Sequence, residues 1–204
     1  MNTLQWNSSE LRVIRSLTTP MAIQKFLDTV GYSADSCYRS PRSVLRDRKA
    51  HCFDGAVFAA VMLQRIGFRP LIMDMQAVRD DDHVIAIFRK NGCWGAIAKS
   101  NFAGLRFREP LYRTRRELVM SYFESFYNIE REKTLRQFTV PLDLSKYPNV
   151  EFVDDVMEEI GLKLSDIPVT KLMTPAQIRA LQPVDDRSYK AGLAGAVTAG
   201  LYRP

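Results

Sequence analysis

Residues 52–67 read CFDGAVFAAVMLQRIG, and this stretch decides the fold. It is apolar nearly all the way round a helical projection, and Gly67 ends it. A helix without a polar face is typical of one buried between other elements. Small side chains along it would let neighbouring elements approach its backbone closely: Gly55, Ala56, Ala59 and Ala60. The stretch therefore predicts a central buried helix that begins at Cys52.

Helical signals precede this stretch and extended segments follow it. Thr19-Pro20 and Ser40-Pro41 each combine an N-cap residue with proline at the first helical position. Residues 69–78 (RPLIMDMQAV) predict a strand, and residues 83–100 predict a hairpin with a two-residue Asn91-Gly92 turn. We therefore expect an α+β fold, in which the buried helix carries the cysteine at its N-terminus and packs on a mainly antiparallel sheet with flanking helices.

The rest of the chain continues this plan in one domain, 1–204. Its core is expected at about 18–145, followed by a C-terminal helical extension at about 146–204. Further strands are predicted at 105–112 and 136–144, and further helices at 114–127, 150–162 and 174–182. The Gly/Ala-rich tail from Asp185 is expected to lie at the periphery.

Composition sets the broad class of the protein. The chain has 204 residues, 46% of them hydrophobic and 25% charged, which is typical of a globular protein. Its net charge of +6 favours acidic partners or substrates through long-range attraction. Three cysteines without repeating spacing predict reduced thiols. With neither a signal-peptide pattern nor a membrane-spanning apolar run, the expected location is the cytoplasm.

Cys52 and His83 form a candidate nucleophile and base. A helix N-terminus favours a thiolate, and an imidazole within reach would complete its activation. In the predicted hairpin Lys90 faces Cys93, so His83 would face Ser100, or Asn101 if a bulge shifts the register by one. Either side chain could orient the imidazole. His51, next to Cys52 in sequence, is expected to point elsewhere.

Residues 40–102 resemble the transglutaminase-like superfamily of papain-type cysteine enzymes. The resemblance rests on HCFDGAVFAAVMLQRIGFRP with Cys52, on DHVIAIF with His83, and on CWGAIAKSN with Trp94. In that superfamily an Asp usually follows the aromatic residue by about four positions, where this chain has Ala98. Its place would then pass to Ser100 or Asn101.

The resemblance implies a cysteine hydrolase or acyltransferase that needs no cofactor. Cys52 would attack an amide carbonyl of a peptide or small molecule and form a thioester, which water or an amine would resolve. The backbone N–H of Cys52 and one further donor would stabilise the oxyanion.

Other interpretations of the same residues stay open. Cys52 could be an inert core thiol, and the fold could serve as a non-catalytic binding or scaffolding module. Asp80, Asp81 and Asp82 are expected to form a turn before the strand, and one of them could raise the pKa of His83. No spacing typical of a zinc or calcium site occurs.

Two basic stretches, 41–49 and 106–116, allow three interpretations. They could flank the active-site cleft and attract an acidic substrate, bind nucleic acid, or form a solvated surface with internal salt bridges. The last is favoured over nucleic-acid binding, because the stretches lack the motifs of known nucleic-acid-binding modules.

Overall fold

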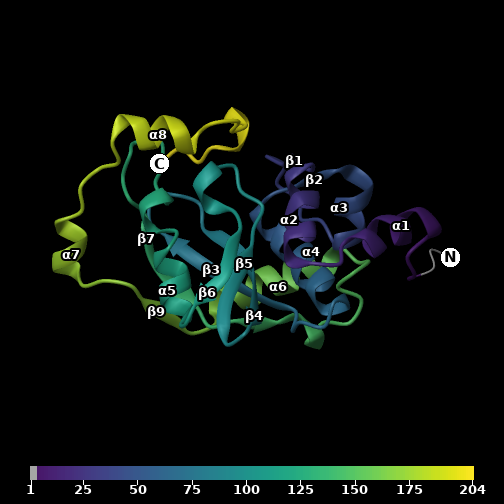
Figure 1. The fold of residues 1–204 in the computed structure, drawn as a ribbon. Helices are drawn as coiled ribbons and strands as arrows, with labels where there is room; N and C mark the ends of the chain where they lie inside the picture. The colour runs from purple at the N-terminus through teal and green to yellow at the C-terminus, as the bar shows by residue number, and fades with distance from the viewer. Residues whose placement is uncertain (1–3) are drawn as a thin grey trace.

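A computed structural model, which describes residues 4–204, has an α+β fold with one main antiparallel sheet (Figure 1). The sheet order is β6-β5-β4-β3-β7-β9, with β8 beside β3. The strands are β3 (Leu71–Ala77), β4 (His83–Lys90), β5 (Cys93–Ile97), β6 (Arg108–Tyr112), β7 (Leu135–Thr139), β8 (Leu142–Asp143) and β9 (Val169–Lys171). A separate parallel pair joins β1 (Gly31–Tyr32) and β2 (Lys49–Ala50). The predicted fold class is confirmed.

The helices are α1 (Ser8–Ser16), α2 (Pro20–Asp28), α3 (Pro41–Asp47), α4 (Cys52–Arg65), α5 (Arg115–Met120), α6 (Asp155–Asp166), α7 (Pro175–Arg179) and α8 (Asp186–Gly192). Thr19 and Ser40 cap α2 and α3 as predicted, each accepting a backbone N–H three residues on. Helix α5 is shorter than predicted, because the chain turns into a short 3₁₀ helix at Phe123–Ser125.

Helix α4 lies at the centre of the larger of two hydrophobic cores. Its residues Phe53 to Leu63 are all buried. One face of the sheet packs on α4 and contributes Ile72, Val84 and Ala86 to this core. The opposite face contributes Met75 and Ile85 to a second core with α5. The alternation of side chains along β3 and β4 therefore decides which residues can face α4.

Gly55 in α4 allows Lys99 to pack against the helix backbone. A Cβ at position 55 would lie 2.3 Å from Cβ of Lys99. The Lys99 ammonium is buried and donates to the carbonyl oxygens of Leu27 and Val30 at the C-terminal end of α2. These contacts fix the segment that follows β5.

Gly55→Ala should therefore destabilise the fold by about 1–3 kcal/mol, the usual penalty for overpacking a core. The clash involves the stem of a side chain anchored at both ends, so little relaxation is possible. Chemical denaturation would measure the change, with Gly67→Ala as a comparison. Position 67 has open space around it but a φ of +91°, so its penalty comes from backbone strain alone. An unchanged denaturation midpoint for Gly55→Ala would contradict the close packing.

The β4–β5 hairpin has the predicted register. Lys90 pairs with Cys93, and the pairing runs regularly to Ala86 and Ile97. Asn91 and Gly92 both have positive φ, as the tight turn requires. This pairing ends at Ile97, before it would reach Ser100 and His83. Gln24 of α2 bonds both backbone groups of the next residue, Ala98. Its Nε2 donates to the Ala98 oxygen, and its Oε1 accepts from the Ala98 N–H.

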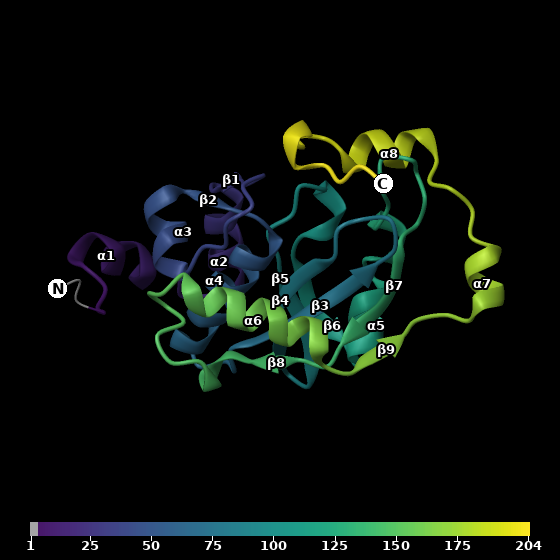
Figure 2. The same cartoon turned by 180° about the vertical axis from the view of Figure 1, so that it is seen from behind.

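The C-terminal part of the chain is not purely helical. Strand β9 extends the main sheet by pairing with β7, and the chain then runs through α7 and α8. In Figures 1 and 2, α8 and the segment after it lie along the top of the molecule. None of residues 185–204 is buried, and the end of this tail borders the site described below.

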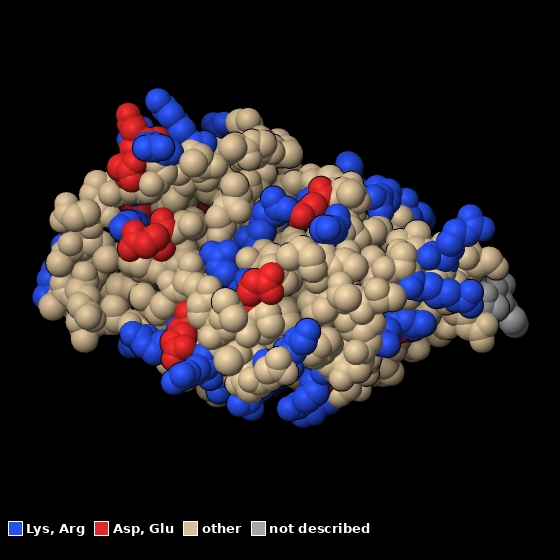
Figure 3. All heavy atoms as spheres, in the orientation of Figure 1, with Lys and Arg blue, Asp and Glu red and all other residues tan. Residues whose placement is uncertain are grey.

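The surface carries its basic residues in several separate groups on the face shown in Figure 3. Residues of the two basic stretches have partners within the protein. Arg46 pairs with Asp47 at 2.7 Å, Arg106 pairs with Asp28, and the Arg108 guanidinium lies over the Tyr122 ring. These contacts agree with a solvated, internally paired surface. Among residues 4–204, no helix is both long and apolar enough to cross a bilayer.

Candidate active site

Cys52 is the first residue of α4, and His51 caps that helix. The Asp54 N–H points at Nδ1 of His51, and the Asp54 carboxylate accepts the N–H groups of His51 and Arg39. Burial lowers the pKa of His51 to about 4, so the imidazole is neutral at pH 7. His51 therefore shapes the start of the helix.

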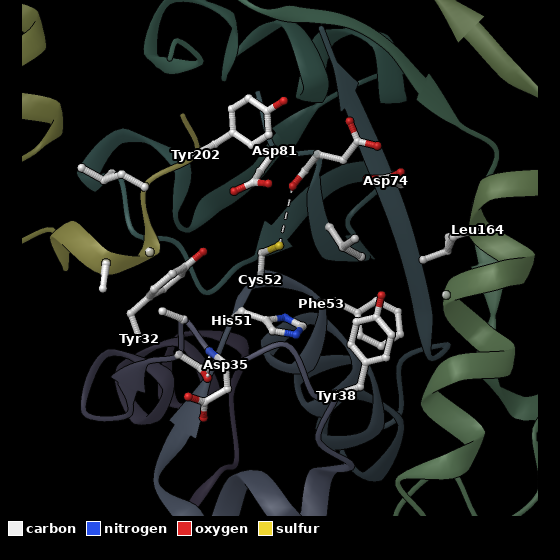
Figure 4. Close-up of a pocket in the computed structure, with 18 of the residues that line it drawn as sticks. Tyr32, Asp35, Tyr38, His51, Cys52, Phe53, Asp74, Asp81, Leu164 and Tyr202 are labelled. Carbon is white, nitrogen blue, oxygen red and sulfur yellow. Dashed lines mark hydrogen bonds between the residues drawn. The ribbon is translucent and has the colours of Figure 1, made fainter. Parts of the chain in front are cut away.

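The Cys52 thiol lies against the start of β4. It donates to the carbonyl oxygen of Asp82 at 3.7 Å (Figure 4), and the backbone N–H of Val84 also bonds the sulfur. Burial raises the pKa of Cys52 to about 12. Loss of hydration thus outweighs the favourable helix N-terminus, and the resting group is a neutral thiol.

His83 is the first residue of β4, and its ring is buried. Nε2 lies 2.9 Å from the carbonyl oxygen of Leu105, and the ring meets Phe126 edge-on. Because a carbonyl oxygen only accepts, Nε2 carries the proton and Nδ1 keeps a free lone pair. Burial lowers the pKa of His83 to about 4, so it is neutral at pH 7. A neutral imidazole with a free lone pair is the form that can accept a proton.

Cys52 and His83 border the same small cavity, whose volume is about 40 Å³. The sulfur contacts the backbone on both sides of His83, whereas the imidazole turns toward the second core. Among the described residues, no hydrogen bond joins the Cys52 thiol to the His83 ring. The thiol bonds the backbone at the start of β4, and the ring bonds the carbonyl oxygen of Leu105. The cavity is large enough to hold a water molecule.

Ser100 and Asn101, the predicted partners of His83, also border this cavity. The Ser100 hydroxyl accepts the N–H of Phe102. Asn101 donates from Nδ2 to the carbonyl oxygens of Val197 and Gly200 and accepts the Val197 N–H at Oδ1. The His83 imidazole instead hydrogen-bonds the carbonyl oxygen of Leu105. A role of Ser100 or Asn101 in orienting His83 stays a prediction.

A larger cavity of about 480 Å³ opens on the other side of Cys52. Helix α4 contributes Cys52 and Phe53, the sheet contributes Asp74 and Val84, and the tail contributes Tyr202. Figure 4 shows Cys52 near the middle of this group, with Tyr32 and Tyr38 on one side and Asp74 and Asp81 on the other. A substrate in this cavity would lie beside the thiol.

Three features of the site escaped the sequence analysis. The Leu105 carbonyl is backbone and has no sequence signal. The tail reaches the site from about 150 residues away along the chain, which spacing does not predict. Asp74 did leave a signal, because it is the only charged residue in LIMDMQA, a strand that is otherwise mostly apolar.

The aspartates before His83 structure the β3–β4 turn, as expected. Asp80 accepts the Thr134 hydroxyl, and Asp82 accepts the Ala77 N–H. In the described part of the chain, no three His, Cys, Asp or Glu side chains gather as metal ligands.

A scan against models of protein families and a search of curated proteins find no match. A search of solved structures finds similarity to Legionella pneumophila LapG (EGTA-treated), with a TM-score of 0.40 and 13% sequence identity. The alignment covers 73% of this chain and 84% of that one.

Proposed function

We propose that the protein is a cysteine hydrolase or acyltransferase that acts on an amide bond. The observation that carries the proposal is the position of the Cys52 thiol. It begins the central helix, borders two cavities, and shares the smaller one with a neutral histidine whose Nδ1 lone pair is free. This arrangement supports the proposal, with a candidate base beside the smaller cavity and room for a substrate in the larger one.

The chemistry proceeds in two steps. His83 accepts the thiol proton through a bridging water, the Cys52 sulfur bonds to the amide carbon, and the C–N bond breaks as that proton passes to the leaving amine. The product of this step is a thioester. Water then attacks the thioester carbon, the C–S bond breaks, the acid leaves, and the thiol recovers its proton. An amine in place of water would give a new amide.

Burial of both groups would gate the proposed chemistry. With pKa values of about 12 for the thiol and about 4 for the imidazole, the pair rests in its neutral form. Neutral pairs react only when a positioned base removes the proton during attack. A substrate that displaces water from the larger cavity would bring its carbonyl to that thiol.

Acylation by an activated substrate tests the proposal. A peptide p-nitrophenyl ester should acylate Cys52 and release nitrophenolate, because that ester needs little help with its leaving group. Cys52→Ser should abolish acylation at this position, and His83→Ala should slow it at least tenfold through loss of the base. Intact-protein mass spectrometry with peptide mapping locates the acyl group. Cys37→Ser and Cys93→Ser serve as matched controls and should react like the wild type.

A binding module is the second candidate function, and one observation favours it. The His83 ring is held by Leu105 and Phe126 on the face of the sheet away from α4. Acylation that is equal in the wild type and in His83→Ala, or that falls on Cys37, would favour this second function over the enzyme.

A further inference from the structure

The cavity beside Cys52 is negatively lined in a protein of net charge +6. Among residues 4–204, its wall includes no lysine or arginine but four aspartates: Asp35, Asp74, Asp81 and Asp82. The imidazole in the wall, His51, is neutral. The net charge of the whole chain suggested an acidic substrate. The acidic lining of this cavity favours a basic ligand instead.

Asp74 is the buried member of this group. Only 6% of this residue is exposed, and its Oδ1 atom has no hydrogen-bond partner among the described residues. The neutral side chain of Gln76 also hydrogen-bonds the carboxyl. Asp74 lies on β3 opposite Val84, on the face of the sheet that packs on α4. An unpartnered buried carboxylate oxygen is costly, so a ligand that donates to it would recover a large part of the lost hydration.

The other aspartates differ in how far they are neutralised. Asp35 is paired with Arg39. Asp82 uses Oδ1 to accept a backbone N–H, and Asp81 is exposed at the rim. No basic group contributes to the pKa of Asp74, which burial and Asp82 raise to about 7. Three carboxyl groups around the cavity therefore lack a cationic partner.

Aromatic side chains complete the wall: Tyr32, Tyr38, Phe53 and Tyr202. Tyr38 and Phe53 pack with their ring centroids 4.8 Å apart. Ring faces attract cations and also bury an aliphatic stem. The combination favours an organic cation over a metal ion, which would require several oxygen ligands at once. The described residues offer no such cluster.

We propose that this cavity binds an organic cation, a guanidinium or ammonium group on an aliphatic stem, with Asp74 as its buried counter-charge. The proposal rests on the proposed function, since the cation belongs to the substrate whose carbonyl meets Cys52. A basic side chain next to the attacked bond would place its stem between the tyrosines and its charge at Asp74.

Binding of four matched probes tests the proposal on the full-length protein. Nα-acetyl amides of arginine, lysine, norleucine and glutamate are titrated by calorimetry. Arginine or lysine amide should bind at least tenfold more tightly than norleucine amide, and glutamate amide should bind most weakly. The first two probes distinguish guanidinium from ammonium. Equal affinity for the cationic and neutral probes would overturn the proposal.

Two variants assign the charge within the cavity. Asp74→Asn, which is nearly isosteric, should weaken binding of the cationic probe at least tenfold. Asp35→Asn should change it less than threefold, because Arg39 already neutralises that carboxylate. Circular dichroism confirms that both variants are folded. An equal loss in both variants would contradict Asp74 as the counter-charge, and saturable calcium binding without probe binding would show a metal site instead.

The Cys52→Ser protein separates this inference from the proposed function. Probe binding should persist in Cys52→Ser, because the cation does not contact the thiol. If the cationic probe binds but Cys52 is not acylated, the proposed enzyme is contradicted and the cation site stands. If Cys52 is acylated with no preference for basic peptides, the cation site is contradicted and the proposed enzyme stands.

Discussion

Asn101→Ala is expected to raise the alkylation rate of Cys52 at least tenfold. Asn101 holds three backbone groups of the tail, two at Val197 and one at Gly200. Gly200 and Tyr202 in turn border both cavities around the thiol. Loss of the side-chain amide leaves these groups without partners, which costs about 1–3 kcal/mol and favours detachment of the tail.

The expected increase in the alkylation rate comes from hydration of the Cys52 thiol. Burial is the main cause of the raised pKa of Cys52, and the tail supplies part of that burial. When water reaches the sulfur, its pKa falls toward the usual value near 9, and the reactive thiolate fraction at pH 8 rises steeply. Iodoacetamide labelling followed by peptide mass spectrometry measures the rate at each cysteine.

The chain provides its own references for this experiment. Cys37 is exposed and Cys93 is partly exposed, so both label in the same sample. Gln182→Ala is the matched control, because it removes an amide from the C-terminal part of the chain at an exposed position away from Cys52. A tail that becomes sensitive to protease while the Cys52 rate stays constant would show that the tail does not shield the thiol.

The parts of the fold that follow from local signals could be predicted from the sequence. Caps at Thr19 and Ser40, the Asn91-Gly92 turn, and the all-round apolar pattern of α4 each depend on neighbours within a few residues. The hairpin register followed from the turn alone. These features reflect backbone geometry, which short-range sequence determines.

The parts of the site that involve distant partners could not be predicted. Extrapolation of the hairpin placed Ser100 opposite His83, but the β4–β5 pairing ends at Ile97, and Gln24 of α2 bonds the backbone of Ala98. Asn101 was a candidate if a bulge shifted the register by one, yet its side chain bonds the tail. Contacts between residues far apart in the chain, such as Gln24 with Ala98 and Asn101 with the tail, leave no periodic pattern in the sequence.

The free energy of unfolding of the wild type should fall as pH rises, and Asp74→Asn should remove the part of that fall that comes from Asp74. The pKa of Asp74 is about 7 in the folded protein, against 3.8 in the unfolded chain. Between these values the folded state binds the proton that the unfolded state has released. The free energy of unfolding contributed by this carboxyl is therefore full below about pH 4, declines as pH rises through 7, and then levels off.

The size of the effect follows from the shift. At 1.36 kcal/mol per pKa unit, the decline attributable to Asp74 is up to about 4 kcal/mol. His51 and His83 act with the opposite sign between about pH 4 and 6.5, since their folded pKa values are lowered. Asp54, with a pKa raised to about 7, acts in the same direction as Asp74. All three are retained in the variant, so the difference between the two proteins reports Asp74 together with its coupling to Asp82.

Urea denaturation of both proteins at pH 5, 6, 7 and 8 measures that difference. The variant should gain on the wild type by about 2–4 kcal/mol between pH 5 and pH 8. Asp35→Asn is the control in the same cavity. Its pKa is lowered by Arg39, so removing it should cost stability, if anything, and give no gain at high pH. Parallel curves for the wild type and Asp74→Asn would mean that Asp74 ionises normally. By contrast, a buried carboxyl that destabilises the protein without ligand is what we expect of a site that binds a cation.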